Sequence, residues 1–378
     1  MIMHKSILII AGEASGDLHG AGLVRALKNR MPDLHIFGIG GSRMRDEGME
    51  LVYHADDLAF IGFAEVVRHY PTLRKIFNHM VKLAKQKKPD LVILIDYPGF
   101  NLRYAKALHA QGLKILYYIA PQVWAWGKGR VKKMAKIIDK MAVIFQFEKD
   151  IFADAGIDTV FVGHPLLEVL QAESNREEFF KKNNLDEQRP LVALLPGSRP
   201  QEVRTLLPEM LRTAQRILQD LPEIQFVAAK AASIAAEDYE HILGDSHICR
   251  LVERDTYSAM SYADAAIVAS GTATLETACF ATPFVIGYRV KWLSYQLMKR
   301  LITIPYIGLV NVVAGNKIID EFIQNDFKAE NVAPAIIQLL QNDKVRRQII
   351  DNLRSVKQKL GKAGASECAA EAALEMQK

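Results

Sequence analysis

Cysteine is scarce in this sequence. Only three cysteines occur among 378 residues, and Cys249, Cys279 and Cys368 lie far apart along the chain. No two of them have the spacing of a zinc-binding pair, and their dispersal excludes a disulfide framework. The sequence therefore favours a reducing, cytosolic setting.

Long apolar runs are absent as well. No stretch approaches the roughly 18 apolar residues that indicate a membrane-spanning helix. The amino-terminal run SILIIAG, residues 6–12, resembles a short signal-peptide core, but acids and glycines follow it closely. We therefore interpret it as a buried first strand and expect a protein that is soluble or attached to a membrane surface.

A strong net charge is also missing, because the formal charge is only +5. This value gives no argument for nucleic-acid binding. The basic residues do cluster, and such clusters are either solvated helix faces or surfaces that attract anionic partners. The clusters are Lys82, Lys85, Lys87 and Lys88, and Lys128, Arg130, Lys132, Lys133, Lys136 and Lys140.

The sequence does contain a regular alternation of short apolar runs and helical patterns. The runs, such as DLVILID at 90–96, are continuously apolar, as in parallel strands covered on both faces. The length also exceeds one ordinary core. We predict an α/β protein with two Rossmann-like, doubly wound domains at residues 1–165 and 166–344. The charged segment 165–190 would contain the connection and a surface helix, and a helical tail at about 345–378 could pack back on the first domain.

The loops at the carboxyl ends of parallel strands are the candidate ligand sites. The first, GEASGD at residues 12–17, has two glycines that permit close approach of a ligand. Ser15 or Asp17 could cap the following helix. The loop lacks the spaced-glycine dinucleotide fingerprint, so NAD binding is not supported. A capped turn without a ligand is the alternative.

Asp96 ends a strongly apolar strand, which is a costly position for a carboxylate. Asn101 stands where the cap of the next helix is expected. Asp96 would then be free to act as a general base, with a structural capping role as the alternative.

Two further loops suit a nucleotide diphosphate. Pro196–Arg199 offers backbone donors, a hydroxyl and a guanidinium that matches phosphate. Ser270–Thr272 ends another apolar strand and precedes a helix, whose first amides favour an anion. Glu276, one turn into that helix, is spaced to accept hydrogen bonds from ribose hydroxyls.

Several motifs, taken together and in order, resemble the lipid-A-disaccharide synthases. They are GEASGD, IDYPGFN, PQVWAWGKGR, FEKDIF, FVGHP, LLPGSR, ASGTATLE and GLVNVVAGNKIIDEFIQ. The resemblance implies a GT-B glycosyltransferase, with two Rossmann-like domains facing across a cleft and no metal or other cofactor. It implies an inverting condensation of UDP-2,3-diacylglucosamine with 2,3-diacylglucosamine 1-phosphate. The products would be UDP and the β-1,6-linked lipid A disaccharide.

The resemblance also implies roles for individual residues. Asp96 would be the catalytic base with Glu13 as the fallback, and Ser15 and Asn101 would lie on the acceptor side. The UDP-sugar site would consist of Ser198, Arg199, Ser270, Gly271, Thr272, Glu276, Asn311 and Gln324. Some members of the family carry an acid at the position of Gly99, so more weight falls on Asp96 here.

Other conspicuous residues leave alternatives open. His19 and His164 could be bases, but a structural role is the simpler interpretation. Trp124 and Trp126 are either core or a wall for acyl chains. The basic amphipathic stretch 291–302 is either a buried helix or an interface with lipid, and the diacylated substrate favours the interface. Its membrane-contact residues would be Trp292, Leu297, Met298 and Arg300.

These assignments predict an enzyme on the cytoplasmic face of the inner membrane, without a nucleic-acid partner. The sequence does not determine the oligomeric state, and a homodimer is compatible with it. The rival functions are a UDP-N-acetylglucosamine epimerase or other GT-B enzyme, which would need no apolar, basic rim, and a non-catalytic nucleotide-sugar-binding protein. The combination of Asp96, Arg199 and Glu276 argues against pure binding, because binding does not require an acid at the end of a buried strand.

Overall fold

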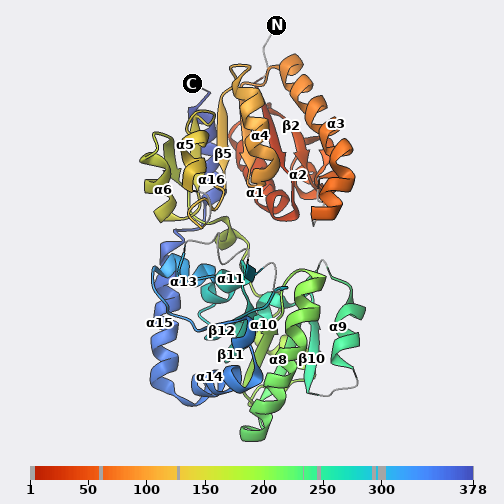
Figure 1. The fold of residues 1–378 in the computed structure, drawn as a ribbon, viewed down its shortest axis with the longest axis vertical. Helices are drawn as coiled ribbons and strands as arrows, with labels where there is room; N and C mark the ends of the chain where they lie inside the picture. The colour runs from red at the N-terminus through yellow and green to blue at the C-terminus, as the bar shows by residue number, and fades with distance from the viewer. Residues whose placement is uncertain are drawn as a thin grey trace. The chain divides into compact units, whose positions relative to one another are not determined.

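The chain folds into two compact units, each built on its own parallel sheet (Figure 1). The computed structural model describes residues 5–58, 63–125, 128–232, 234–244, 248–291, 295–296 and 304–377. The N-terminal unit contains the chain up to Glu168 together with the final segment from Leu360, and the C-terminal unit spans Val169–Lys359. The α/β class predicted from the alternating runs is confirmed.

The sheet of the N-terminal unit has, within the described residues, seven parallel strands in the order β3-β2-β1-β4-β5-β6-β7. Its central strands are buried on both faces because their side chains are continuously apolar; all of Leu91–Ile95 is 0% exposed. The strands are β1 (Ser6–Ala11), β2 (His35–Gly40), β3 (Glu50–His54), β4 (Leu91–Ile95), β5 (Ile115–Tyr118), β6 (Lys140–Val143) and β7 (Asp158–Phe161).

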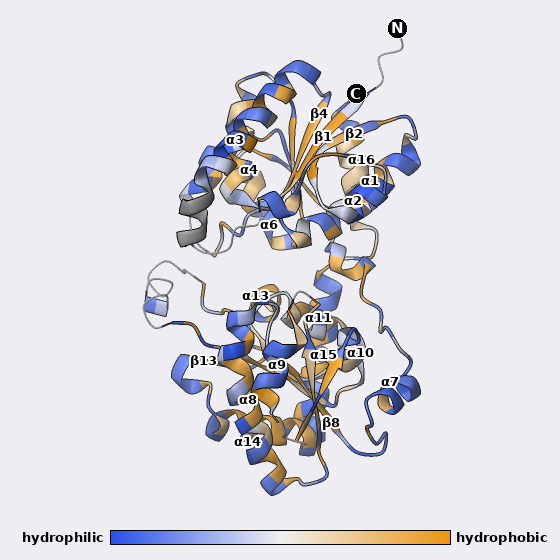
Figure 2. Cartoon of the chain, turned by 90° about the vertical axis from the view of Figure 1, so that its right-hand side faces the viewer, coloured by the Kyte–Doolittle hydropathy of each residue, from blue (hydrophilic) through white to orange (hydrophobic). Residues whose placement is uncertain are grey.

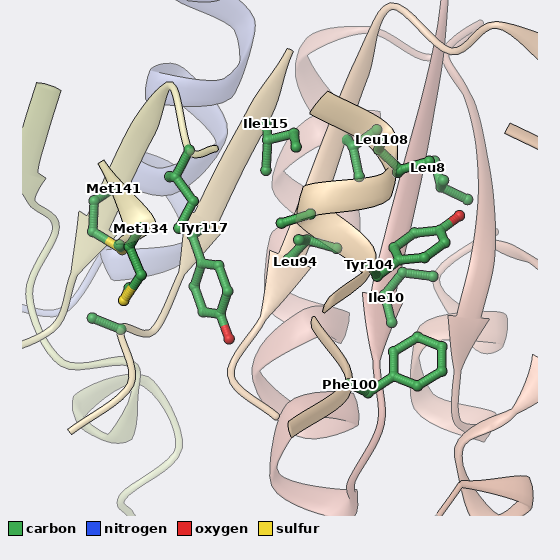
Figure 3. Packing of buried hydrophobic residues seen from close by; sticks show 14 of the residues in the cluster. Leu8, Ile10, Leu94, Phe100, Tyr104, Leu108, Ile115, Tyr117, Met134 and Met141 are labelled. Atoms are coloured by element: carbon green, nitrogen blue, oxygen red, sulfur yellow. The ribbon is translucent and has the colours of Figure 1, made fainter. Parts of the chain in front are cut away.

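Helices connect these strands and bury their apolar sides against the sheet. Figure 3 shows Tyr104 and Leu108 of one helix beside Leu8 and Ile10 of β1. The helices are α1 (Ala14–Arg30), α2 (Ser42–Asp46), α3 (Phe63–Lys87), α4 (Pro98–His109), α5 (Val131–Met134), α6 (Gln146–Ala153) and α16 (Ala365–Glu375), with 3₁₀ turns at Ala55–Asp57, Lys128–Arg130 and Pro165–Glu168.

The C-terminal unit repeats this architecture. Its described residues form a six-stranded parallel sheet in the order β10-β9-β8-β11-β12-β13. The strands are β8 (Leu191–Leu195), β9 (Gln225–Lys230), β10 (Cys249–Glu253), β11 (Ala265–Ala269), β12 (Phe284–Tyr288) and β13 (Glu321–Ile323). The helices are α7 (Arg176–Lys182), α8 (Pro200–Asp220), α9 (Ala236–Leu243), α10 (Thr256–Tyr262), α11 (Ala273–Cys279), α13 (Leu309–Ala314), α14 (Ala329–Gln341) and α15 (Asp343–Lys359), with a 3₁₀ turn at Gln324–Asp326.

The strand orders create one switch point in each unit. From β1 the chain proceeds to β2 and β3 on one side, and from β4 it proceeds to β5, β6 and β7 on the other. The same reversal occurs between β8 and β11. Loops that follow the strands flanking a switch point diverge and leave a crevice at the carboxyl edge of the sheet. The sheets therefore bring together the loops after β1 and β4, and those after β8 and β11.

The last two helices belong to different units. α15 packs on α11, α13 and α14, whereas α16 packs on α1. The return to the N-terminal unit therefore begins at Leu360 and not near residue 345. Glu168 secures it, because its carboxylate accepts hydrogen bonds from the Ser366 amide at 2.7 Å and the Ser366 hydroxyl at 2.6 Å.

Two strands were not predicted from the sequence. β3 and β13 lie at the edges of their sheets, and their side chains are only half-buried or exposed. Edge strands need no continuous apolar run, because one side faces solvent. Figure 2 shows the contrast, since the central strands β1, β4 and β8 are largely hydrophobic in colour.

No helix among the described residues is both long and apolar enough to cross a membrane. The longest, α3, has 25 residues, but basic residues recur along it.

Candidate functional site

A cavity of about 350 Å³ opens at the switch point of the C-terminal unit. The loop after β8 and the loop after β11 both line it, with a small apolar floor that includes Leu195, Ala229 and Met260. Six residues named from the sequence line this one cavity: Ser198, Arg199, Ser270, Gly271, Thr272 and Glu276. The sheet topology thus assembles segments that are about 70 residues apart in the sequence.

The loop after β8 is shaped by Glu202. Its carboxylate accepts hydrogen bonds from the amides of Ser198 at 3.0 Å and Arg199 at 3.3 Å. Gly197 has a φ of +113°, and a Cβ there would lie 2.3 Å from Oε2 of Glu202, so glycine is required. The two amides are therefore committed to the fold. The Arg199 side chain is 65% exposed, and its guanidinium Nη1 lies 3.8 Å from Oε1 of Glu202. This loose, exposed ion pair leaves the guanidinium available to a ligand.

The loop after β11 presents backbone donors to the cavity. Within the described part of the chain, the amides of Gly271, Thr272 and Ala273 donate no hydrogen bond, and regular bonding resumes at Thr274. The Ser270 hydroxyl donates to the carbonyl of Ile307 at 3.0 Å, which fixes the loop. Unpaired amides beside a guanidinium form a site for an anionic group.

Glu276 adds a carboxylate to the same cavity. Burial raises its pKa to about 7, partly offset by a 3.5 Å hydrogen bond from the Tyr257 hydroxyl. No basic residue pairs with it among the described residues. A carboxylate in this position can accept hydrogen bonds from ligand hydroxyls, and their donation would favour its ionised form.

Asn311 and Gln324 lie away from this cavity. Asn311 is fully buried; its amide nitrogen donates to Ile319 and Glu321, and its oxygen accepts from the amides of Ile318 and Ile319. The Gln324 side chain bonds both backbone groups of Val290. In the structure both side chains are occupied in holding loops.

In the N-terminal unit, Asp96 follows β4 at the switch point. Asp96 and the next residue, Tyr97, have φ values of 45° and 47°, in the left-handed region. The turn is held because the Asp96 carbonyl accepts hydrogen bonds from the Asn101 side chain at 2.8 Å and the Tyr117 hydroxyl at 2.5 Å. Burial and then the negative charge of Glu13 raise the pKa of Asp96 to about 6, opposed by the Tyr97 amide.

Asn101 does not cap α4, contrary to the sequence-based expectation. Pro98 begins the helix and Tyr97 is its N-cap, so Asn101 lies inside the first turn. Its side chain is fully buried and donates to the carbonyls of Ile95 and Asp96. Asn101 therefore holds the end of β4 in place, although its own amide oxygen has no hydrogen-bond partner.

The capping predicted for the loop after β1 is also wrong. Glu13 is the N-cap of α1, and no side chain caps this helix. Asp17 instead accepts hydrogen bonds from the amides of Gly41 and Met44 at the start of α2, at 2.8 and 3.0 Å. Glu13 and Ser15 are both exposed, and Glu13 is near enough to Asp96 to influence its charge.

The structure adds Glu148, which the sequence analysis did not single out. It is fully buried after β6, and burial raises its pKa to about 7. Its carboxylate accepts hydrogen bonds from the Trp124 indole at 2.9 Å and the Phe145 amide at 3.3 Å. Trp124 is only 6% exposed and belongs to the core, while Trp126 lies outside the described residues. The only hint of Glu148 in the sequence was that it is the glutamate of the motif FEKDIF.

Of the two histidines singled out from the sequence, His164 is buried and His19 is half-buried. Burial lowers the pKa of His19 to about 4, and burial together with the charge of His19 lowers that of His164 to about 3. Both rings are thus neutral at physiological pH. His164 accepts a hydrogen bond from the Leu166 amide at 3.1 Å, in accord with a structural role.

A metal site is not evident. Within the described ranges, no group of three or more histidine, cysteine, aspartate or glutamate side chains is arranged to hold an ion. The membrane-contact residues suggested from the stretch 291–302, which include Trp292 and Arg300, lie outside the described residues.

Comparison with known sequences identifies close relatives along nearly the whole chain. A sequence model of the family described as lipid-A-disaccharide synthetase matches residues 7–376. The lipid-A-disaccharide synthase of Syntrophus aciditrophicus is 43% identical over 98% of this chain and 97% of its own. The enzyme of the same name from Geobacter sulfurreducens is 42% identical, again over 98% and 97%.

Solved structures share the fold at much lower sequence identity. UDP-GlcNAc 2-epimerase from Neisseria meningitidis, bound to UDP-GlcNAc, has a TM-score of 0.67 and 12% identity, covering 98% of this chain and 100% of its own. The calicheamicin glycosyltransferase CalG4 has a TM-score of 0.59 and 15% identity, covering 99% and 98%. These similarities support the two-domain GT-B fold.

Proposed function

The chain belongs to the lipid-A-disaccharide synthase family, and we propose that it joins two acylated glucosamines by a single inverting displacement. The donor is UDP-2,3-diacylglucosamine and the acceptor is 2,3-diacylglucosamine 1-phosphate. The family match favours this glycosyltransferase activity over an epimerase, whose likeness is restricted to the fold. The observation that carries the assignment of the nucleotide site is the convergence of Arg199, Ser270–Thr272 and Glu276 on one cavity.

The cavity of the C-terminal unit would hold the UDP moiety. Arg199 and the amides of Gly271 and Thr272 would bind the diphosphate, where negative charge accumulates as the bond to the sugar breaks. Glu276 would accept hydrogen bonds from the ribose hydroxyls. In this arrangement the guanidinium and the backbone amides would contact the leaving diphosphate. The Glu276 carboxylate would contact the ribose, which carries neighbouring hydroxyls.

Asp96 would supply the base. Its carboxylate takes the proton from the 6-hydroxyl of the acceptor while that oxygen attacks C1 of the donor sugar. The bond from C1 to the UDP oxygen breaks, and UDP leaves with the electron pair. A pKa of about 6 keeps Asp96 mostly ionised at neutral pH and more basic than an ordinary aspartate. Glu13 is the fallback base because its charge already acts on Asp96.

We also propose peripheral attachment to the cytoplasmic face of the inner membrane. The diacylated substrates reside in a membrane, and exposed lysines cluster in the last turns of α3 and directly after it (Lys82, Lys85, Lys87 and Lys88). Sedimentation with phosphatidylglycerol vesicles that is reversed by salt would support this proposal. A homodimer is a separate proposal, and analytical ultracentrifugation of the full chain tests it.

The decisive experiment for the activity is a UDP-release assay with the purified full-length protein. UDP should appear only when the donor and the monosaccharide phosphate are both present, together with a disaccharide 1-phosphate detectable by mass spectrometry. Interconversion of the donor without an acceptor would instead indicate an epimerase. Binding of the donor with no product under any condition would indicate a non-catalytic protein.

A further inference from the structure

A second cavity lies in the N-terminal unit along α3 and α4. These two helices pack against each other (Figure 2). Its volume is about 500 Å³, within the roughly 300–1,000 Å³ typical of ligand sites. The described lining residues are mainly apolar and include Leu73 and Phe77 of α3 and Phe100 of α4. We call this cavity the α3–α4 groove. Its lining suits a hydrocarbon chain better than a sugar.

Aromatic side chains line the groove and continue into the core beneath it. Phe77 meets Phe100 edge to face at 5.6 Å, and Phe100 stacks on Tyr104 at 5.8 Å. Tyr104 is fully buried, and its hydroxyl donates to the carbonyl of Met80. A preformed apolar surface binds a chain without a prior ordering cost. At the groove, Tyr70 is 52% exposed, the one large hydrophobic side chain left so open in the described part of the chain.

Two arginines give the groove a positive rim. Arg74 of α3 and Arg103 of α4 both line it, and both are exposed. Neither forms an ion pair or hydrogen bond within the part of the chain that the structure describes, and none of the described lining residues is acidic. Guanidinium groups beside an apolar groove complement a molecule that carries a phosphate next to a hydrocarbon chain.

Tyr97 connects the groove to the switch point. Its ring lines the groove, and the residue directly follows Asp96. The ring also covers Gly12 at the end of β1, where a Cβ would lie 2.4 Å from the ring carbon Cδ1. The Tyr97 hydroxyl donates to the carbonyl of Leu58 at 2.8 Å, which holds the ring in place. Tyr97 thus lines the groove and is the direct chain neighbour of Asp96.

We propose that the α3–α4 groove binds one acyl chain of the acceptor, while Arg74 and Arg103 bind its 1-phosphate. This inference rests on the proposed function. The acceptor carries its phosphate on C1 and an acyl chain on the adjacent C2, so charge and hydrocarbon leave the sugar side by side. The 6-hydroxyl lies on the other side of the ring and is free to reach Asp96. The groove would thus select a phosphorylated, acylated acceptor.

The charge part of the inference is tested with detergent-dispersed acceptors that either carry or lack the 1-phosphate. Arg74→Ala and Arg103→Ala should each raise the KM for the phosphorylated acceptor about tenfold, a modest value that allows for solvent exposure. The KM for the dephosphorylated acceptor and for the donor should not change. Lys75→Ala and Lys106→Ala remove exposed charges from the same two helices outside the groove, and they should behave as the wild type.

The hydrocarbon part is tested at Gly99, which lines the groove. A Cβ at Gly99 would meet no heavy atom within 4 Å, so Gly99→Leu adds bulk without a clash at the first carbon. Leucine also suits a helix better than glycine. The KM for a long-chain acceptor should rise at least tenfold, since each buried methylene contributes roughly fourfold in affinity. The KM for a butanoyl acceptor should stay unchanged, and Gly99→Ala is the matched control.

The outcomes separate this inference from the proposed function. A wild-type enzyme that forms no disaccharide would refute the proposed function. If the wild type is active but the arginine and Gly99→Leu variants keep normal acceptor KM values, the groove does not bind the acceptor, and the proposed function still stands. If the arginine variants keep the acceptor KM but lose sedimentation with phosphatidylglycerol vesicles, the groove binds membrane lipid and our assignment is wrong.

Discussion

The carboxyl groups of Asp96 and Glu13 are electrostatically coupled across the ends of two paired strands. β1 and β4 lie side by side with Ala11 opposite Ile95, so the residues that follow them emerge together. Burial raises the pKa of Asp96, and the charge of Glu13 raises it further, to about 6. Asp96 is thereby better suited than an ordinary aspartate to accept a proton near neutral pH.

The first prediction concerns the base. Asp96→Asn should lower kcat by about 10²–10⁴-fold, because general-base catalysis contributes that much. UDP affinity, measured by calorimetry, should remain near the wild-type value, since the proposed nucleotide site belongs to the other unit. If Asp96→Asn retains its activity while Glu13→Gln is inactive, Glu13 is the base. Full activity in both variants would contradict general-base catalysis by either acid.

The pH dependence of kcat/KM should reflect the titration of Asp96. Activity should decline as the pH falls below about 6, because Asp96 becomes protonated there. Glu13→Gln removes a negative charge that raises this pKa, so the acidic limb should move to lower pH. Kinetic profiles of the two proteins between pH 5 and 8 make the comparison. A limb that stays in place in Glu13→Gln would argue against the coupling.

Arg199→Ala should weaken UDP binding by roughly thirty- to hundredfold, equivalent to 2–3 kcal/mol for a charge-assisted contact with phosphate. Arg204→Ala is the matched control. Arg204 lies in α8, which begins directly after Arg199, and has similar exposure, at 66%, but it pairs with Asp238 and does not line the cavity. Equal UDP affinities of the Arg199 variant and the wild type would show that Arg199 does not bind UDP.

Glu276 should make UDP binding pH-dependent. Its pKa is raised to about 7 in the unliganded protein, and only the ionised form accepts both ribose hydrogen bonds. Wild-type affinity should therefore weaken as the pH falls from 8 to 6. Glu276→Gln should bind more weakly at pH 8 and lose this component of the pH dependence. Because UDP itself titrates in this range, the difference between the two proteins is the relevant quantity, and a constant difference would contradict the assignment.

Glu148 should affect stability in the opposite direction to an ordinary carboxylate. Its pKa is raised to about 7, so its contribution to stability is greatest below the unfolded pKa and declines as the pH rises through 7. Glu148→Gln is already neutral and keeps one acceptor for Trp124. The Tm of this variant relative to wild type should therefore be higher at pH 8 than at pH 5. A relative Tm that does not change between these pH values would show that Glu148 stays ionised.

The sequence by itself determined the architecture and identified six residues that line the proposed nucleotide cavity. Continuously apolar runs such as Leu91–Ile95 identify buried parallel strands, because only a strand covered on both faces has this composition. In such sheets ligands lie at the carboxyl ends of strands, so Arg199 and Ser270–Thr272 could be placed at one edge. The resemblance in the ordered motifs identified the family, which the comparisons confirm.

Only the tertiary structure decided which side chains are already committed. Asn101 follows a strand and Asn311 lies in a conspicuous motif, yet both are fully buried, and their amides bond backbone carbonyls within the fold. Glu148 is an unremarked acid in sequence, and its burial in the fold raises its pKa, although the hydrogen bond from Trp124 opposes the rise. The groove exists because α3 packs on α4. The pattern of apolar residues along one helix or strand indicates only which of its residues are buried. Hydrogen-bond partners and cavities depend instead on contacts between elements that are distant in sequence.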